Sequence, residues 1–236
     1  MRKTAILQSN YIPWKGYFDI INSVDEFIIY DDVQYTKNDW RNRNKIVSAQ
    51  GLLWLTIPVK KERLAQKIYE TQTADSNWIN RHVKSIRGNY AKSQFYKEFS
   101  DIIFSTYEAC RPERSLSRIN YIFLKAICKI LNIDANITFS FDYPPTEGQT
   151  GRLVSLCEAV NSACYLSGPA ARAYLDERLF AVRGLKLEYM DYSGYPTYPQ
   201  QFGQTFEHGV SVLDLIFNTG PQAPYYIWGW REKCGK

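Results

Sequence analysis

The stretch TAILQSNYIPWKGYFDIINSVDEFIIYDD, residues 4–32, contains the pattern that decides the fold. Residues 4–7 form a short apolar run, which is typical of a buried strand, and Gln-Ser-Asn follows it as an exit loop. Residues 14–21 then place Tyr17, Phe18 and Ile21 at helical spacing. Residues 27–30 are a second apolar run and end in Asp31-Asp32. The stretch therefore predicts a strand, a helix and a second strand in succession.

The rest of the chain extends this order with one interruption. Residues 52–59 (LLWLTIPV) predict a third buried strand, and the polar, basic segment VQYTKNDWRNRNKI before it, residues 33–46, predicts a loop. From about residue 77 to 131 the apolar residues repeat at steps of four, which predicts a three-helix insertion.

The last third alternates again between strand and helix. It has strand patterns at 137–141, 164–166 and 185–189 and helical patterns at 153–160, 170–180 and 211–217. Strands alternating with helices imply right-handed crossovers and a parallel sheet. We predict one α/β domain over residues 1–236, with a mostly parallel, Rossmann-like sheet, flanking helices and the helical insertion.

Composition limits the classes of protein. With 45% hydrophobic and 15% aromatic residues the chain can bury a large core. The 29 basic and 24 acidic residues give a mixed surface, which argues against a nucleic-acid-binding protein but allows a local site for a phosphorylated ligand.

The cysteines and histidines indicate a cytoplasmic protein without a metal site. Five cysteines form no Cys-x-x-Cys pair, which predicts reduced thiols in a cytoplasmic protein. Two histidines are too few for a typical zinc site, and we expect neither a metal nor a cofactor. The chain has no signal-peptide pattern at its start and no apolar stretch of 18 residues, so we expect no membrane span.

In an open parallel sheet, ligands bind beyond the carboxyl ends of the strands. The residues that follow the four best-defined strands are therefore the first candidates for a binding site. They are Gln8, Asn10 and Tyr11, then Asp31, Asp32 and Gln34, then Ser167 and Gly168, and finally Asp191.

The basic segment supplies a second group of candidates. Lys37, Arg41 and Arg43 alternate with Trp40 and Asn42, so guanidinium groups could hold a diphosphate while the indole stacks on a base or a sugar. The alternative interpretation is a solvated basic loop.

Asp31 and His82 are the candidates for a general base. Each has an ordinary structural alternative. Asp31 could cap the turn after its strand, and His82, four residues from both Trp78 and Ile86, could be a hydrogen-bonded core residue. Adjacent carboxylates in a strand point to opposite sides, so only one of Asp31 and Asp32 is expected to face a site.

Several long segments together resemble the WbqC-like protein family. They are ILQSNYIPWKGYFDIINSVDEFIIYDDVQYTKNDWRNRNKI, GLLWLTIPV, TGRLVSLC, YLSGPAARAYLDERLF, YPTYPQ and SVLDLIFNTG, and they cover nearly the whole chain. Ser9 departs from the family, which usually has proline after this glutamine. The layout is also similar to the nucleotidylyltransferase-type fold, with Trp14 and Tyr17 where that fold has the two histidines of a His-x-Gly-His motif.

The resemblance implies a role in O-antigen or related surface-polysaccharide biosynthesis. We expect a transferase that acylates or aminoacylates a nucleotide-linked amino sugar, with an acyl donor or a carrier protein as partner. Asp31 or His82 would be the base, and Asn10, Asn42 and the Ser167-Gly168 turn would stabilise an oxyanion. Trp14 would join the substrate-binding residues. The alternatives are a glycosyltransferase that uses the Asp31-Asp32 pair, and a non-catalytic sugar- or protein-binding partner.

Overall fold

A five-stranded parallel sheet forms the centre of the computed structural model, which describes residues 1–202 and 205–233. The order across the sheet is β7-β2-β1-β8-β9, so the chain starts in the middle, adds strands on one side and then returns to add strands on the other. The α/β class and the Rossmann-like layout are confirmed. The strands are β1 (Lys3–Leu7), β2 (Glu26–Ile29), β7 (Asn136–Phe139), β8 (Cys164–Ser167) and β9 (Lys186–Tyr189).

The central strands β1 and β2 are apolar in their second halves, because both faces of the sheet are covered there. Ala5 pairs in register with Phe27, and both side chains belong to the larger hydrophobic cluster. Ile6 pairs with Ile28, and both belong to a second cluster on the opposite face. The alternation of side chains along a strand thus divides one short sequence between two cores.

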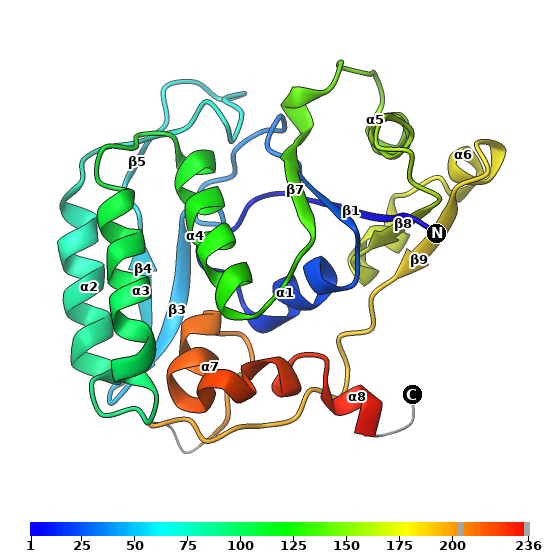
Figure 1. Ribbon diagram of the computed structural model, residues 1–236. Helices are drawn as coiled ribbons and strands as arrows, with labels where there is room; N and C mark the ends of the chain where they lie inside the picture. The colour runs from blue at the N-terminus through cyan, green and yellow to red at the C-terminus, as the bar shows by residue number, and fades with distance from the viewer. Residues whose placement is uncertain (203–204, 234–236) are drawn as a thin grey trace.

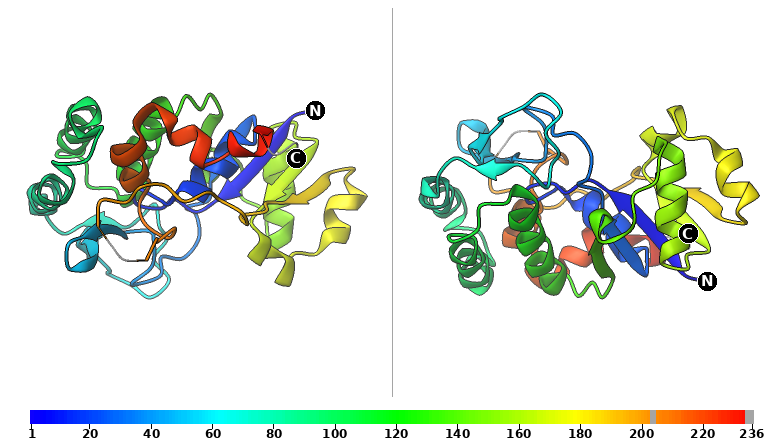
Figure 2. Two further views of the ribbon diagram at one scale, coloured as in Figure 1. Left: turned by 90° about the horizontal axis from the view of Figure 1, so that it is seen from below. Right: turned by 90° about the horizontal axis from the view of Figure 1, so that it is seen from above.

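Helices cover the two faces unequally. The larger cluster receives side chains from α1, α4 and α7, whereas α5 and α6 supply the smaller one. Figure 2 shows α5 and α6 at the opposite end of the molecule from α2 and α3. The helices are α1 (Lys15–Asn22), α2 (Asn77–Tyr90), α3 (Tyr96–Ala109), α4 (Leu116–Ile130), α5 (Gln149–Ala159), α6 (Glu177–Val182), α7 (Val212–Thr219) and α8 (Trp230–Lys233), with 3₁₀ turns η1 (Ser140–Asp142), η2 (Pro169–Ala173) and η3 (Gly220–Tyr226).

Two predictions about the segment between β2 and α2 are wrong. Residues 43–46 do not lie in a loop, because β3 (Arg43–Ser48) pairs antiparallel with β4 (Gly51–Thr56). β4 is not a buried strand either, because this hairpin stands outside the parallel sheet and the exposed fractions of Leu52 and Trp54 are 44% and 42%. A second small sheet joins β5 (Val59–Lys60) to β6 (Gln72–Thr73).

The helix predicted over residues 170–180 is interrupted. η2 ends at Ala173, and α6 begins after Asp176, whose side chain accepts a hydrogen bond from the backbone N–H of Arg178. An aspartate in this position satisfies a helix N-terminus, so it starts a new helix rather than continuing the old one.

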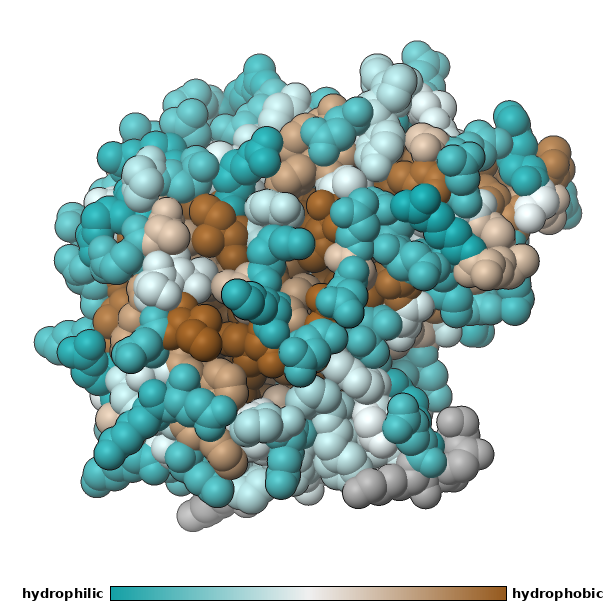
Figure 3. Space-filling model, viewed as in Figure 1, coloured by the Kyte–Doolittle hydropathy of each residue, from teal (hydrophilic) through white to brown (hydrophobic). Residues whose placement is uncertain are grey.

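On the face seen in Figure 3, hydrophilic side chains dominate the periphery, and hydrophobic surface appears in patches towards the middle. Among the helices of residues 1–202 and 205–233, none has both the length and the apolar character needed to cross a membrane.

Candidate functional site

The first candidate site is a cavity of about 670 Å³ at the carboxyl edge of the parallel sheet, which we call the strand-edge cavity. It lies where the strand order reverses between β1 and β8, the usual ligand position in folds of this type. Its size is within the range of small-molecule sites. The lining residues are Ile6, Leu7, Gln8, Tyr30, Asp32, Val33, Gln34, Lys67, Pro145, Thr146, Gly148, Gln149, Arg152, Leu153, Tyr165 and Tyr174.

An ion pair frames one wall of this cavity. Arg152 Nη2 donates to Asp32 Oδ2 at 3.1 Å and to the carbonyl oxygen of Ser140 at 2.5 Å, and Nη1 donates to the carbonyl oxygen of Pro144. Asp32 Oδ1 accepts from Ser140 Oγ at 2.6 Å. The side chains of Arg152 and Asp32 are 6% and 17% exposed, so the pair is largely shielded from water.

The same wall carries donors for an anion. Helix α5 begins after Gly148, whose φ of 80° favours glycine and which offers no side chain to cap the helix. The first N–H groups of a helix lack partners within the helix and attract negative charge. Lys67 adds an exposed ammonium group to the cavity lining. The strand-edge cavity therefore combines anion donors with the rings of Tyr30, Tyr165 and Tyr174.

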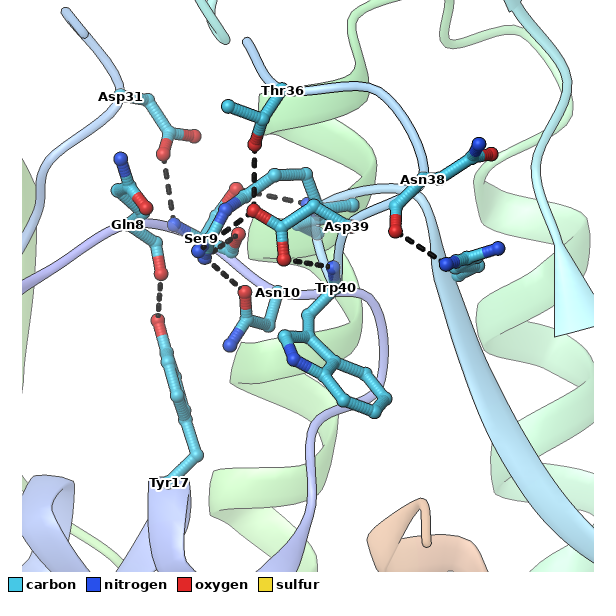
Figure 4. A network of polar contacts seen from close by, with 12 residues as sticks. Gln8, Ser9, Asn10, Tyr17, Asp31, Thr36, Asn38, Asp39 and Trp40 are labelled. Atoms are coloured by element: carbon cyan, nitrogen blue, oxygen red, sulfur yellow. Dashed lines mark hydrogen bonds and ion pairs between the residues drawn. The ribbon is translucent and has the colours of Figure 1, made fainter. Parts of the chain in front are cut away.

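The second candidate site is a smaller cavity of about 330 Å³, which we call the tryptophan cavity. Its lining residues are Asn10, Pro13, Trp14, Trp40, Asn44, Lys45 and Gly209. Figure 4 shows the exit loop of β1 with Gln8 at one end and Asn10 at the other. Gln8 lines the strand-edge cavity and Asn10 lines the tryptophan cavity, so one short loop contributes to both.

The structure thus divides the predicted site into two parts. Gln8, Asp32 and Gln34 line the strand-edge cavity, whereas Asn10, Trp14 and Trp40 line the tryptophan cavity. Two predicted arginines stand beside the second group. Arg41 donates to Asn10 Oδ1 and to the carbonyl oxygen of Ser9, and the Arg43 guanidinium lies 4.3 Å from the ring centre of Trp54.

Asp31 lies in the core and lines neither cavity. Its Oδ1 accepts the backbone N–H of Ser9 at 2.8 Å, and its Oδ2 accepts the hydroxyl of Ser117 at 2.5 Å. Burial raises the pKa of this carboxyl group above its usual value. Asp31 and Asp32 therefore point to different surroundings and do not form one acidic pair, although both lie beyond the end of β2 rather than within it.

These bonds also explain why serine is compatible with position 9. The Ser9 N–H that binds Asp31 would be absent in proline, and the Ser9 hydroxyl accepts a second bond from Asn120 Nδ2 at 2.9 Å. Hydrogen bonding therefore fixes the turn that a proline ring would otherwise restrict.

His82 is also a core side chain that lines neither cavity. Its Nδ1 is 2.8 Å from the hydroxyl of Tyr11, which in turn lies 2.6 Å from the hydroxyl of Tyr107. Its Nε2 is 3.2 Å from the carbonyl oxygen of Thr56, so the neutral ring donates there and accepts from Tyr11. Burial lowers the pKa of His82 to about 4.

The other predicted site residues take structural or peripheral places. Asn42 is buried and donates to the carbonyl oxygen of Ile57 at 2.8 Å, while Lys37 is exposed and lines neither cavity. The Ser167 hydroxyl donates a hydrogen bond to the hydroxyl of Tyr165 at 3.3 Å. Gly168, the next residue, caps the N-terminus of η2. Asp191 lies on an exposed segment, where it accepts the backbone N–H of Ser193 at 2.9 Å.

Sequence reasoning missed the basic residues of the strand-edge cavity. Arg152 follows β7 in the next helix, and Lys67 lies in the connection between β5 and β6. Applying the carboxyl-edge rule to the strand at 137–141 would have drawn attention to the α5 N-terminus. No local pattern marks Lys67, whose position depends on the path of the chain past Gln34, to which it pairs in an isolated bridge.

The start of α1 does not present a phosphate-binding surface of the nucleotidylyltransferase kind. The Trp14 indole folds back over Gly16 so closely that a Cβ atom there would overlap the ring. An aromatic ring therefore covers the first turn of α1.

The cysteines are not available as nucleophiles in the described part of the chain. Cys110, Cys128, Cys157 and Cys164 are buried free thiols, and burial raises the pKa of Cys157 to about 12. Cys234 lies outside the described residues.

Comparison with known proteins identifies a family and a relative for this chain. The sequence model of the WbqC-like protein family matches residues 8–226, which include the whole lining of the tryptophan cavity and all but Ile6 and Leu7 of the strand-edge cavity. The chain is 46% identical over 228 residues to an uncharacterized protein, Rv1507c, of Mycobacterium tuberculosis (strain ATCC 25618 / H37Rv); the match covers 96% of this chain and 98% of the relative. No solved structure matches the chain.

Proposed function

We propose a function for this chain as a member of the WbqC-like protein family, to which it belongs: a cytoplasmic transferase for a nucleotide-linked amino sugar in surface-polysaccharide assembly. The observation that carries the proposal is the strand-edge cavity. It combines anion donors, aromatic rings and one carboxylate at the position where open α/β sheets bind nucleotides.

In this proposal each part of the cavity has a task. The first turn of α5 and the Lys67 ammonium hold the diphosphate. The tyrosine rings flank the base or the sugar, which present flat faces to them. Asp32 receives the sugar amine, because the carboxylate keeps lone pairs beyond those used by Arg152 and Ser140.

The chemistry we propose is acyl transfer to that amine. The nitrogen lone pair attacks the acyl carbonyl carbon, a C–N bond forms, and the donor's leaving group departs with its electron pair. The amine gives up one proton, which Asp32 accepts. This assignment replaces Asp31 and His82 as the group that handles the proton, because both lie in the core with their polar atoms engaged.

A binding measurement tests the diphosphate site. We expect Lys67→Ala to weaken the affinity for a nucleoside diphosphate by about tenfold, the usual size of one charge-assisted hydrogen bond. Isothermal titration with UDP, GDP and dTDP would measure it. Lys61→Ala is the matched control, because Lys61 is an exposed lysine of the same segment that lines neither cavity. Equal affinities for the two variants would contradict the proposed site.

Deletion of the gene tests the biological role. We expect the surface glycan to lose an N-acyl substituent while its repeat unit stays complete, as measured by mass spectrometry of the isolated polysaccharide. Complementation with Asp32→Asn should leave the substituent missing, because the amide cannot accept the proton. A truncated repeat unit would point instead to a glycosyltransferase. Full rescue by Asp32→Asn would favour the non-catalytic partner, which the core positions of Asp31 and His82 also fit.

A further inference from the structure

The tryptophan cavity has no occupant in the proposal above, although three tryptophans stand at or beside it. Trp14 and Trp40 line the cavity, and Trp54 lies next to Trp40 with its ring centre 5.7 Å away and the ring planes inclined by 31°. At that spacing the two rings contact each other, so no ligand ring can enter between them. Both Trp40 and Trp54 nevertheless leave 42% of their surface exposed, which makes the outer face of Trp40 available for stacking.

A lysine in the lining of this cavity supplies a cation for a ligand. Lys45 lines the cavity, its Nζ lies 5.9 Å from the ring centres of both Trp40 and Trp54, and it forms no ion pair within the part of the chain that the structure describes. Arg41, by contrast, has Asp39 at 3.6 Å and donates to Asn10. The nearby Glu207 is also engaged, because its Oε1 accepts the backbone N–H of Gly209 at 2.7 Å.

The backbone directly before Pro13, a lining residue of the cavity, is held in a strained conformation. Ile12, a buried β-branched residue, has a φ of 40°, a conformation that such residues rarely adopt. Asn44 maintains it by donating to the carbonyl oxygens of Ile12 at 2.7 Å and Tyr11 at 3.2 Å. Strain of this kind persists where the surrounding contacts enforce it, and it often marks a binding site. Asn44, which lines the cavity, therefore fixes the backbone that leads into Pro13.

We propose that the tryptophan cavity binds an anionic sugar, a pyranose that carries a carboxylate or a phosphate. Its C–H face stacks on Trp40, its negative group meets Lys45, and a hydroxyl accepts from the amide nitrogen of Asn10. The volume of about 330 Å³ suits one such ring better than a whole nucleotide. Gln8 and Asn10 of one loop line the two cavities, so the anionic sugar would bind next to the nucleotide-linked sugar. This last step rests on the proposed function.

Ligand-detected NMR titrations with glucuronate and with glucose 1-phosphate test the site. Lys45→Met keeps most of the aliphatic stem and removes the charge, and we expect it to weaken binding of the anionic sugar about tenfold. Trp40→Ala should weaken it by a similar factor. Lys37→Met is the matched control, because Lys37 is an exposed lysine of the same segment that lines neither cavity, and it should leave the affinity unchanged. Methyl glucoside should bind equally to the Lys45→Met variant and to the wild type.

The outcomes separate this inference from the proposed function. Binding of only one of the two anionic sugars would identify its anionic group and support the site. The site is overturned if neither sugar binds, if Lys45→Met and Trp40→Ala leave binding unchanged, or if a nucleoside monophosphate displaces the sugar. Saturating UDP should not compete with the sugar. Sensitivity of UDP binding to Lys67→Ala is a separate measurement, so the nucleotide site and the sugar site can fail independently.

Discussion

Arg152→Met is expected to lower the free energy of unfolding by about 3 kcal/mol, because breaking one side of a buried ion pair leaves the other charge without compensation. Arg152 joins Asp32, in the segment that follows β2, to the carbonyl oxygens of Ser140 and Pro144. Methionine fills a similar volume and favours the helix, so the loss reflects the polar contacts rather than α5 itself. Urea unfolding monitored by circular dichroism would measure it.

A surface arginine provides the comparison. Arg183 pairs with Glu158 at 3.3 Å, but their side chains are 60% and 44% exposed. Exposed pairs contribute little, so Arg183→Met should cost less than about 1 kcal/mol. The double variant Arg152→Met with Asp32→Asn should recover part of the stability, because the unpaired charge is gone. If Arg152→Met destabilised the protein no more than Arg183→Met, the ion pair would have no structural role.

Acidification from pH 7 to pH 4 is expected to remove about 3 kcal/mol of stability through His82 alone. Folding lowers the pKa of His82 from 6.5 to about 4. Between pH 6.5 and pH 4, His82 is therefore protonated in the unfolded chain but neutral in the native protein. Stability from this group is therefore complete above pH 6.5 and is lost as the pH falls towards 4. The size follows from about 1.4 kcal/mol for each pKa unit. Denaturation curves at several pH values would show it.

The comparison with His82→Gln isolates this histidine. Glutamine can accept from Tyr11 and donate to Thr56 but does not titrate, so the variant should lose less stability on acidification. The buried carboxyl groups Asp31 and Asp214, whose pKa values burial raises, favour the native state on acidification and act in the opposite direction in both proteins. Burial also lowers the pKa of His208, so His208→Gln measures the contribution of the other histidine separately. Parallel pH profiles for wild type and His82→Gln would show that His82 is not held neutral.

Local pattern was sufficient for the parallel sheet and most helices. The apolar runs at 4–7 and 27–30 became β1 and β2, and the helical spacing after residue 77 became α2, α3 and α4. It failed for the hairpin, because Trp54 and its neighbours read as a buried strand although their apolar side chains remain exposed. The hydrophobicity of a residue shows that its burial would be favourable. It does not show whether another element packs against that residue in the folded protein.

The sequence by itself determined the fold class, the family and the edge of the sheet at which polar residues gather, because side-chain periodicity and strand ends are local properties. Only the tertiary structure decided which of those residues face a cavity. Asp31 and Asp32 are neighbours, yet the first meets Ser9 and Ser117 in the core and the second meets Arg152 at the strand-edge cavity. Partners 86 and 120 residues away make that difference, and contacts at such separations depend on how helices pack, which no short window of sequence contains.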